Sequence, residues 1–88
     1  MTRTEITNRL KQMIVRRLQL KIQPDEIQEA AALFQGGLGL DSVEALELVV
    51  GIEEEFGVNV DNGESTKKRF FSVDTLSDYV LELLGAVA

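Results

Sequence analysis

The sequence predicts an all-α fold, a small bundle of three main helices with room for a short fourth, on two observations. Apolar residues recur at helical spacing in three separate segments, and a residue able to cap a helix stands before each of them. With 88 residues, the chain has room for one domain and one modest hydrophobic core. We therefore expect a single domain over residues 1–88.

The first helix is expected from about Thr4 to Leu20. Thr2 and Glu5 have the spacing of a capping box, in which each side chain binds the backbone N–H of the other residue. The basic residues of this segment lie on its polar face, which we expect to be solvated. The core-facing stripe consists of Ile6, Leu10, Met13, Ile14 and Leu18.

A long loop is expected from Lys21 to Leu40, because this stretch carries the only proline of the chain, Pro24, and three of its seven glycines. Within it, the run from Glu26 to Phe34 is expected to form a helical turn or two. A loop of this length in a compact domain usually serves a function.

The second helix is expected to begin at Asp41 and to end at Gly57. Asp41 and Glu44 repeat the capping-box spacing, and Gly57 stands where a glycine C-cap belongs. A helical wheel places one apolar stripe toward the core. This stripe consists of Ala45, Leu48, Val49, Ile52 and Phe56.

For the last part of the chain, the sequence predicts an irregular stretch followed by a final helix. Between Val58 and Phe71 we expect a strand-like bend and one short helix. Ser72 is placed to cap the last helix, which should end near Gly85. Its apolar stripe consists of Val73, Leu76, Val80, Leu83 and Leu84.

Composition excludes most enzyme classes. The chain has no cysteine and no histidine, so it lacks thiolate nucleophiles, zinc ligands of the usual kind and the usual base for activating a serine. Its net charge is -6, and every charged residue between Gln23 and Thr66 is acidic. Such a segment disfavours binding to the phosphate backbone of a nucleic acid and favours binding to a partner with a basic face. We expect no catalytic residue, no metal site and no nucleic-acid partner.

We expect neither a membrane span nor a signal peptide in this chain. No stretch reaches the roughly 20 consecutive apolar residues that a membrane span needs. The N-terminus alternates Thr, Arg and Glu where a signal peptide would have an apolar run. We therefore expect a cytoplasmic chain with no membrane span.

The second helix carries a second apolar strip on an arc separate from its core stripe, and glutamates border that strip. One interpretation is that the strip only covers loop residues. The other is a docking surface, in which the apolar centre is buried against a partner and the acidic rim steers the partner's basic face. The candidate docking residues are Val43, Leu46, Glu47, Val50, Glu53 and Glu54.

Ser42 directly follows the expected N-cap, so its hydroxyl projects from the first turn of the second helix. Unpaired N–H groups and the positive end of the helix dipole would stabilise a phosphate ester there. From helix physics alone, an ordinary role in the helix start is the simpler interpretation of Ser42.

The string around Ser42 is more specific. Residues 38–43 (LGLDSV), 47–48 (EL) and 53–58 (EEEFGV) resemble the acyl carrier protein family, and the resemblance spans nearly the whole chain. The attachment motif of that family is a Gly-x-Asp-Ser-Leu type of string. Gly39, Asp41 and Ser42 match it, and Val43 replaces the more common Leu or Met.

The resemblance implies that Ser42 is esterified with 4'-phosphopantetheine, which a separate phosphopantetheinyl transferase takes from coenzyme A. The thiol of this arm would carry an acyl group as a thioester in fatty-acid, polyketide or related biosynthesis. The chain would then be a carrier and a phosphoprotein, and not an enzyme. We expect a monomer whose partners are acyl ligases, synthases or transferases with basic docking faces.

Two departures from the family pattern favour a specialised carrier over a housekeeping fatty-acid carrier. Gly36 and Gly37 replace polar residues and should loosen the loop, and residues 67–71 (KKRFF) replace an acidic short helix. The basic triplet of this segment is interpreted as a solvated turn, a pathway-specific contact or a partner of the acidic helix. We expect its two phenylalanines to be core or pocket wall, and Tyr79 to lie on the rim of the last helix.

Two other functions stay open. The chain could be a stand-alone aminoacyl or peptidyl carrier, because fatty acyl, polyketide and aminoacyl thioesters share one arm. It could also be an unmodified acidic helical module that uses the second helix only for docking. The motif leaves the acyl cargo and the pathway open.

Overall fold

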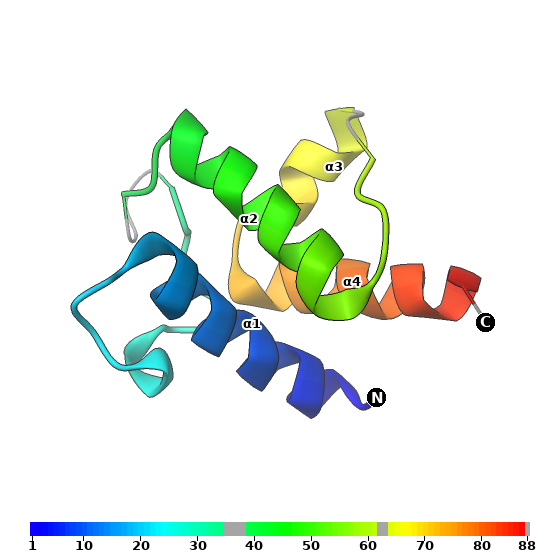
Figure 1. Ribbon diagram of the computed structural model, residues 1–88, viewed down its shortest axis with the longest axis horizontal. Coiled ribbons are helices and arrows are strands. Elements are labelled where there is room, and N and C mark those ends of the chain that lie inside the picture. The colour runs from blue at the N-terminus through cyan, green and yellow to red at the C-terminus, as the bar shows by residue number, and fades with distance from the viewer. Residues whose placement is uncertain (35–38, 62–63, 88) are drawn as a thin grey trace.

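The computed structural model describes residues 1–34, 39–61 and 64–87. Within these residues it contains four α-helices and one 3-10 turn (Figure 1). The helices are α1 (Arg3–Leu18), α2 (Ser42–Phe56), α3 (Glu64–Arg69) and α4 (Val73–Val87), and the turn is η1 (Pro24–Glu26). The predicted all-α bundle, including the short extra helix, is confirmed.

Both predicted capping boxes are present. At the start of α1, the hydroxyl of Thr2 accepts a hydrogen bond from the N–H of Glu5 at 3.2 Å, and the Glu5 carboxylate accepts one from the Thr2 N–H at 3.2 Å. At the start of α2, Asp41 accepts from the N–H of Glu44 at 2.9 Å, and Glu44 accepts from the Asp41 N–H at 3.1 Å. Each box satisfies donors that a helix start otherwise leaves unpaired.

The C-terminal ends of the first two long helices agree with the sequence in part. α2 ends at Phe56, and Gly57 follows in the left-handed region with φ of 66°, which glycine adopts without strain. α1 ends at Leu18, earlier than the expected Leu20, because Gln19 adopts the left-handed conformation with φ of 52° and closes the helix.

Ser72 caps α4, as expected. Its hydroxyl accepts from the N–H of Thr75 at 3.2 Å, and the Thr75 hydroxyl accepts from the Ser72 N–H at 3.0 Å. The arrangement is a capping box with a hydroxyl in place of the usual carboxylate. α4 continues to Val87, beyond the predicted end at Gly85.

The connection between α1 and α2 has its helical turn earlier than expected. The turn is η1, which starts at Pro24 and shares only one residue with the predicted Glu26–Phe34 run. Proline suits a first helical position, where its missing N–H needs no partner. The apolar residues further along are anchors of a loop and not a helical stripe: Ile27 and Leu33 are 4% and 1% exposed.

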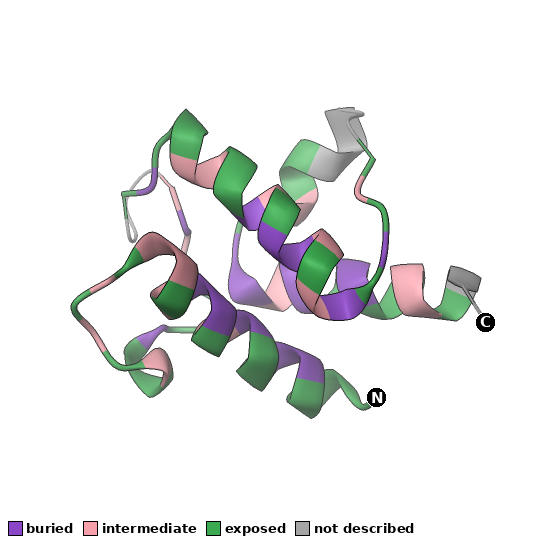
Figure 2. Ribbon diagram, viewed as in Figure 1, coloured by how far each residue is buried: buried purple, intermediate pink, exposed green. Residues whose placement is uncertain are grey.

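One core lies between the three long helices, because α1 packs against both α2 and α4 and α2 also contacts α4 (Figure 1). Buried residues follow the inner sides of these helices (Figure 2). The fully buried apolar side chains of the three helices are Ile6, Leu10, Met13, Ile14, Leu48, Ile52, Val73, Leu76 and Val80.

Two expectations about the surface are wrong. Tyr79 does not lie on the rim of α4 but is 7% exposed, and its hydroxyl accepts a hydrogen bond from the N–H of Asp61 at 3.1 Å. The basic face of α1 is not simply solvated, because α2 and α4 bring carboxylates to it. Arg3, for example, forms an ion pair with Asp78 on α4 at 2.8 Å.

Candidate functional site

Ser42 is the first residue of α2 and is exposed to solvent. Asp41 before it is the N-cap, and its carboxylate is engaged with the N–H of Glu44. Ser42 and the next residue, Val43, belong to the helix turn whose N–H groups have no partner four residues earlier in the helix. The structure therefore presents the Ser42 hydroxyl where the helix end favours an anion.

Backbone hydrogen bonds hold the turn that leads to Ser42. The N–H of Gly39 donates to the carbonyl of Phe34 at 3.0 Å, and the N–H of Leu40 donates to the carbonyl of Leu33 at 3.1 Å. Gly39 has φ of 70°, a conformation that is strained for other residues even though open space surrounds it. The glycine of the attachment motif is thus explained by the backbone of this turn.

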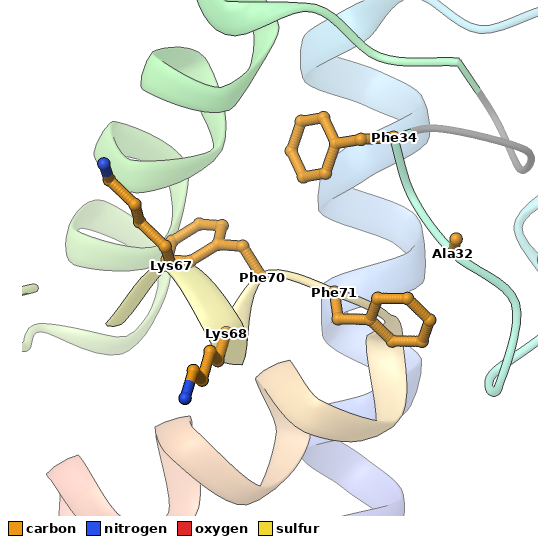
Figure 3. A pocket seen from close by; sticks show the side chains of 6 residues that line it. All are labelled: Ala32, Phe34, Lys67, Lys68, Phe70 and Phe71. Atoms are coloured by element: carbon orange, nitrogen blue, oxygen red, sulfur yellow. The ribbon is translucent and has the colours of Figure 1, made fainter. Parts of the chain in front are cut away.

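A cavity of about 470 Å³ lies between the end of the α1–α2 loop and the end of α3 (Figure 3). Phe70 is 7% exposed and Phe71 is 56% exposed, and both form part of the wall, as expected. Figure 3 shows the ends of Lys67 and Lys68 pointing away from Phe71. The wall of the cavity is mainly apolar. The lining residues are Ala32, Phe34, Lys67, Lys68, Phe70 and Phe71.

Leu33 forms backbone hydrogen bonds both to the cavity wall and to the turn before Ser42. The N–H of Leu33 donates to the carbonyl of Phe71 at 2.8 Å, and the Leu33 carbonyl accepts from Leu40. Leu33 itself is 1% exposed and Leu40 is 7% exposed. These bonds fix the cavity wall relative to the start of α2.

The second apolar strip of α2 is open to solvent. Val43, Leu46 and Val50 are 73%, 68% and 43% exposed, whereas Leu48 and Ile52 on the inner side are fully buried. Figure 2 shows exposed residues along the outer side of this helix. The interpretation in which loop residues cover the strip is therefore wrong for the part of the chain that the structure describes.

The acidic rim of the strip is engaged within the molecule, which the sequence reasoning missed. Arg17 of α1 forms ion pairs with Glu47, at 2.7 Å, and with Glu54. Glu53 accepts a hydrogen bond from the N–H of Val60 at 2.9 Å. The basic residues of the first helix were a signal for such pairs, but their partners lie 30 and 37 residues away in the chain.

The basic triplet before the phenylalanines has a partner on α4. Arg69 pairs with Glu82 at 3.0 Å, and its guanidinium carbon lies 5.5 Å from the centroid of the Tyr79 ring, within reach of a cation–π interaction. For Arg69, the interpretation as a partner of the acidic second helix is therefore wrong. Lys67 and Lys68 are exposed and contribute to the cavity.

Three further points concern two glycines of the loop, metal binding and membrane spans. Gly36 and Gly37, which were expected to loosen the loop, lie outside the described residues. Among the residues that are described, no group of three or more His, Cys, Asp or Glu side chains could hold a metal ion. None of the helices in the described ranges is long and apolar enough to cross a membrane.

Comparison with known proteins agrees with the geometry around Ser42. Residues 8–83 match the family model described as "Phosphopantetheine attachment site". The chain is 35% identical over 78 residues to a protein of Arabidopsis thaliana named "Acyl carrier protein 2, mitochondrial"; the match covers 89% of this chain and 58% of that protein. The chain thus spans under two thirds of the length of this relative.

The matched family is defined by one cofactor, 4'-phosphopantetheine, which its members hold covalently. Acyl carrier proteins are carriers and not catalysts. The described residues fit this cofactor, because an exposed serine hydroxyl stands at the anion-favouring end of α2. The family match covers most of the chain, and the all-helical fold agrees with it, so the chain belongs to the family described as "Phosphopantetheine attachment site".

Proposed function

We propose that the chain is an acyl carrier whose 4'-phosphopantetheine is attached to the side-chain oxygen of Ser42. The observation that carries the proposal is the position of this serine, exposed at the first residue of α2 and directly after the Asp41 cap. The motif residues Gly39, Asp41 and Val43 support the same assignment. The bound arm supplies a thiol, which holds an acyl group as a thioester.

The residues next to Ser42 suit a phosphodiester. First-turn N–H groups and the helix dipole favour its negative charge. Asp41 and Glu44 would oppose that charge, but both carboxylates accept hydrogen bonds from backbone N–H groups. Gly39 and Leu40 hold the turn before the serine, so the hydroxyl faces solvent where a transferase reaches it.

Loading requires a phosphopantetheinyl transferase and coenzyme A. A phosphodiester bond forms at the oxygen of Ser42, the phosphoanhydride bond of coenzyme A breaks, and the nucleotide half of coenzyme A leaves. The hydroxyl proton of Ser42 passes to a base of the transferase, because the chain has no histidine and the carboxylates of Asp41 and Glu44 already accept hydrogen bonds from backbone N–H groups.

The outer side of α2 is proposed to dock the transferase and the acyl ligases, synthases or transferases that use the carrier. Exposed apolar side chains at its centre would be buried against a partner, and the glutamates would steer a basic face toward it. This docking surface consists of Val43, Leu46, Glu47, Val50, Glu53 and Glu54.

The cargo is proposed to be an acyl group of fatty-acid, polyketide or related biosynthesis. The mainly apolar cavity beside Phe34, Phe70 and Phe71 supports a cargo with apolar atoms. The basic residues at its edge, Lys67 and Lys68, support a specialised carrier over a housekeeping one. The name of the plant relative places that protein in mitochondria, and the cytoplasmic location expected for this chain stays a prediction.

The test is co-expression with a phosphopantetheinyl transferase followed by intact-mass analysis. Wild-type protein should gain the mass of one phosphopantetheine, and Ser42→Ala should gain none. Ser65→Ala is the matched control, a serine substitution outside the motif that should still be loaded. Absence of any adduct, or an adduct on Ser42→Ala, would contradict the proposal and favour an unmodified docking module.

A further inference from the structure

The side chain of Arg17 crosses from the last turn of α1 to the outer side of α2. Its Nη1 lies 2.7 Å from Oε1 of Glu47, and its Nη2 contacts Oε2 of Glu54. The hydrogen bond to Glu47, together with the charge of Glu54, raises the pKa of Arg17 above its ordinary value. One guanidinium therefore holds two carboxylates that stand two helical turns apart.

Gly51 makes room for this crossing. It lies between the two glutamates on α2, and a Cβ there would lie 2.7 Å from Cδ and 2.9 Å from Nε of Arg17. The same Cβ would lie 2.6 Å from Sδ of Met13. The missing side chain thus forms a slot in which the stem of Arg17 lies across the helix.

The other carboxylates of α2 are also engaged within the molecule. Glu44 and Glu53 accept hydrogen bonds from backbone N–H groups, and Glu55 pairs with Arg16 at 3.3 Å. The charge that a basic partner meets on this helix is therefore already partly neutralised. Within the docking surface, Glu47 and Glu54 differ from Glu53 because the group that neutralises them is a side chain of the kind that a basic partner would itself offer, whereas Glu53 accepts from a backbone N–H.

Exposure indicates how a partner would reach these two glutamates. The side chain of Arg17 is 22% exposed, whereas those of Glu47 and Glu54 are 47% and 65% exposed. The carboxylates therefore face the partner side of the surface, and the guanidinium approaches them from the α1 side. Ion pairs with this much solvent contact are weak, so exchange of one cation for another costs little.

We infer that Arg17 is an internal competitor for the docking surface: a partner docks by placing its own arginine or lysine on Glu47 and Glu54 in exchange for Arg17. The inference rests on the proposed function, because it assigns the occupant of the proposed docking surface. Arg17 lowers the affinity of every basic partner that uses these two carboxylates. Partners that bind only the apolar strip are not affected.

The test measures the KM of a phosphopantetheinyl transferase for the unloaded carrier, with intact mass as the readout. Arg17→Gln is compared with Arg16→Gln, which removes the same charge from the neighbouring position and frees Glu55, a residue outside the docking surface. We expect KM to be about threefold to tenfold lower for Arg17→Gln than for Arg16→Gln. Equal KM values for the two variants would overturn the inference.

A second comparison separates competition from a general effect of charge or packing. In a protein that already carries Glu47→Gln and Glu54→Gln, neither position has a carboxylate with which Arg17 could form an ion pair. There, Arg17→Gln and Arg16→Gln should give equal KM values. A difference that persists in this background would show that Arg17 acts by another route, and the inference would be wrong.

Folding is followed by far-UV circular dichroism for each variant. Should Arg17→Gln fail to fold, Arg17→Lys replaces it, since lysine keeps the charge but cannot hold two carboxylates with one planar group. Its KM is expected to be about twofold below that of wild type. An unchanged KM in folded Arg17→Lys would then overturn the inference.

The inference and the proposed function fail in different ways. Absence of a phosphopantetheine adduct on all variants would remove the assignment of Ser42 as the attachment site and the inference with it. Normal loading, with KM equal for Arg17→Gln and Arg16→Gln, would leave Ser42 as the attachment site and remove only the competition by Arg17.

Discussion

Gly51 is buried in the middle of α2, a position at which alanine ordinarily favours a helix. The absence of a side chain there has a packing reason. Met13 and Arg17 of α1 occupy the space that a Cβ would need. At the scale of single residues, this glycine sets how closely the first helix approaches the helix that carries Ser42.

Gly51→Ala should therefore lower stability although it removes a glycine from a helix. The gain in helix propensity is roughly 1 kcal/mol, and overpacking against α1 costs about 1–3 kcal/mol, so we expect a net loss of about 1 kcal/mol in urea unfolding. Gly85→Ala is the control, because nothing lies within 4 Å of its Cβ position. It should stabilise the protein, and equal stabilisation by both substitutions would contradict the packing role of Gly51.

At the scale of elements, a side-chain cap begins each of the three long helices. Thr2, Asp41 and Ser72 each accept a hydrogen bond from the backbone N–H of the third residue of the helix. For α2 the cap also sets the place of Ser42, the residue that follows it. The start of a helix thus coincides with the proposed attachment site, because the cap defines where free N–H groups are exposed.

The cap of α1 predicts that the stability of the protein depends on pH. Hydrogen bonds from the backbone N–H and the hydroxyl of Thr2 lower the pKa of Glu5 below its ordinary value of 4.5. A carboxylate with a lowered pKa in the folded state contributes stability above its unfolded pKa, and this contribution is lost as pH falls through the folded pKa.

Glu5→Gln should therefore lower the thermal midpoint near neutral pH and leave it unchanged in acid, well below pH 4.5. The measurement is a series of melting curves for both proteins followed by far-UV circular dichroism. A difference between the two proteins that is the same at all pH values would show that the Glu5 charge does not take part in the cap.

At the scale of the whole molecule, one buried polar contact joins the first and last helices. The hydroxyl of Ser77 donates to the carbonyl of Val73 at 2.8 Å, so its oxygen accepts the hydrogen bond from Thr7, at 2.7 Å. Both side chains are buried, with Thr7 at 4% and Ser77 at 0% exposure. Because α1 also packs on α2, this contact helps to fix α1, and with it Arg17, in the bundle.

Thr7→Val should cost about 1 kcal/mol of unfolding free energy, because valine keeps the volume but removes the donor. Thr4→Val makes the same change at an exposed position of α1 and should alter stability by less than about 0.5 kcal/mol. Both values come from chemical unfolding. If the two substitutions cost the same, the hydrogen bond between α1 and α4 is not what Thr7 contributes.

Part of the site could be predicted from the sequence because its cause is local. The position of Ser42 follows from the Asp41 cap, whose two hydrogen bonds join residues three apart. The exposure of Val43, Leu46 and Val50 followed from the helical wheel only as one of two alternatives. The exposure of these side chains became definite once the structure showed that α1 and α4 pack on the other side of α2.

The sequence by itself determined the helix class, the caps, the ends of α2 and the serine of the attachment string. These features arise from interactions between near neighbours along the chain, which a sequence displays directly. Only the tertiary structure decided the burial of Tyr79, the cavity beside Phe71 and the pairing of Arg17 with the acidic rim. Each depends on residues from separate elements that packing brings together, and no local pattern records which elements will be neighbours.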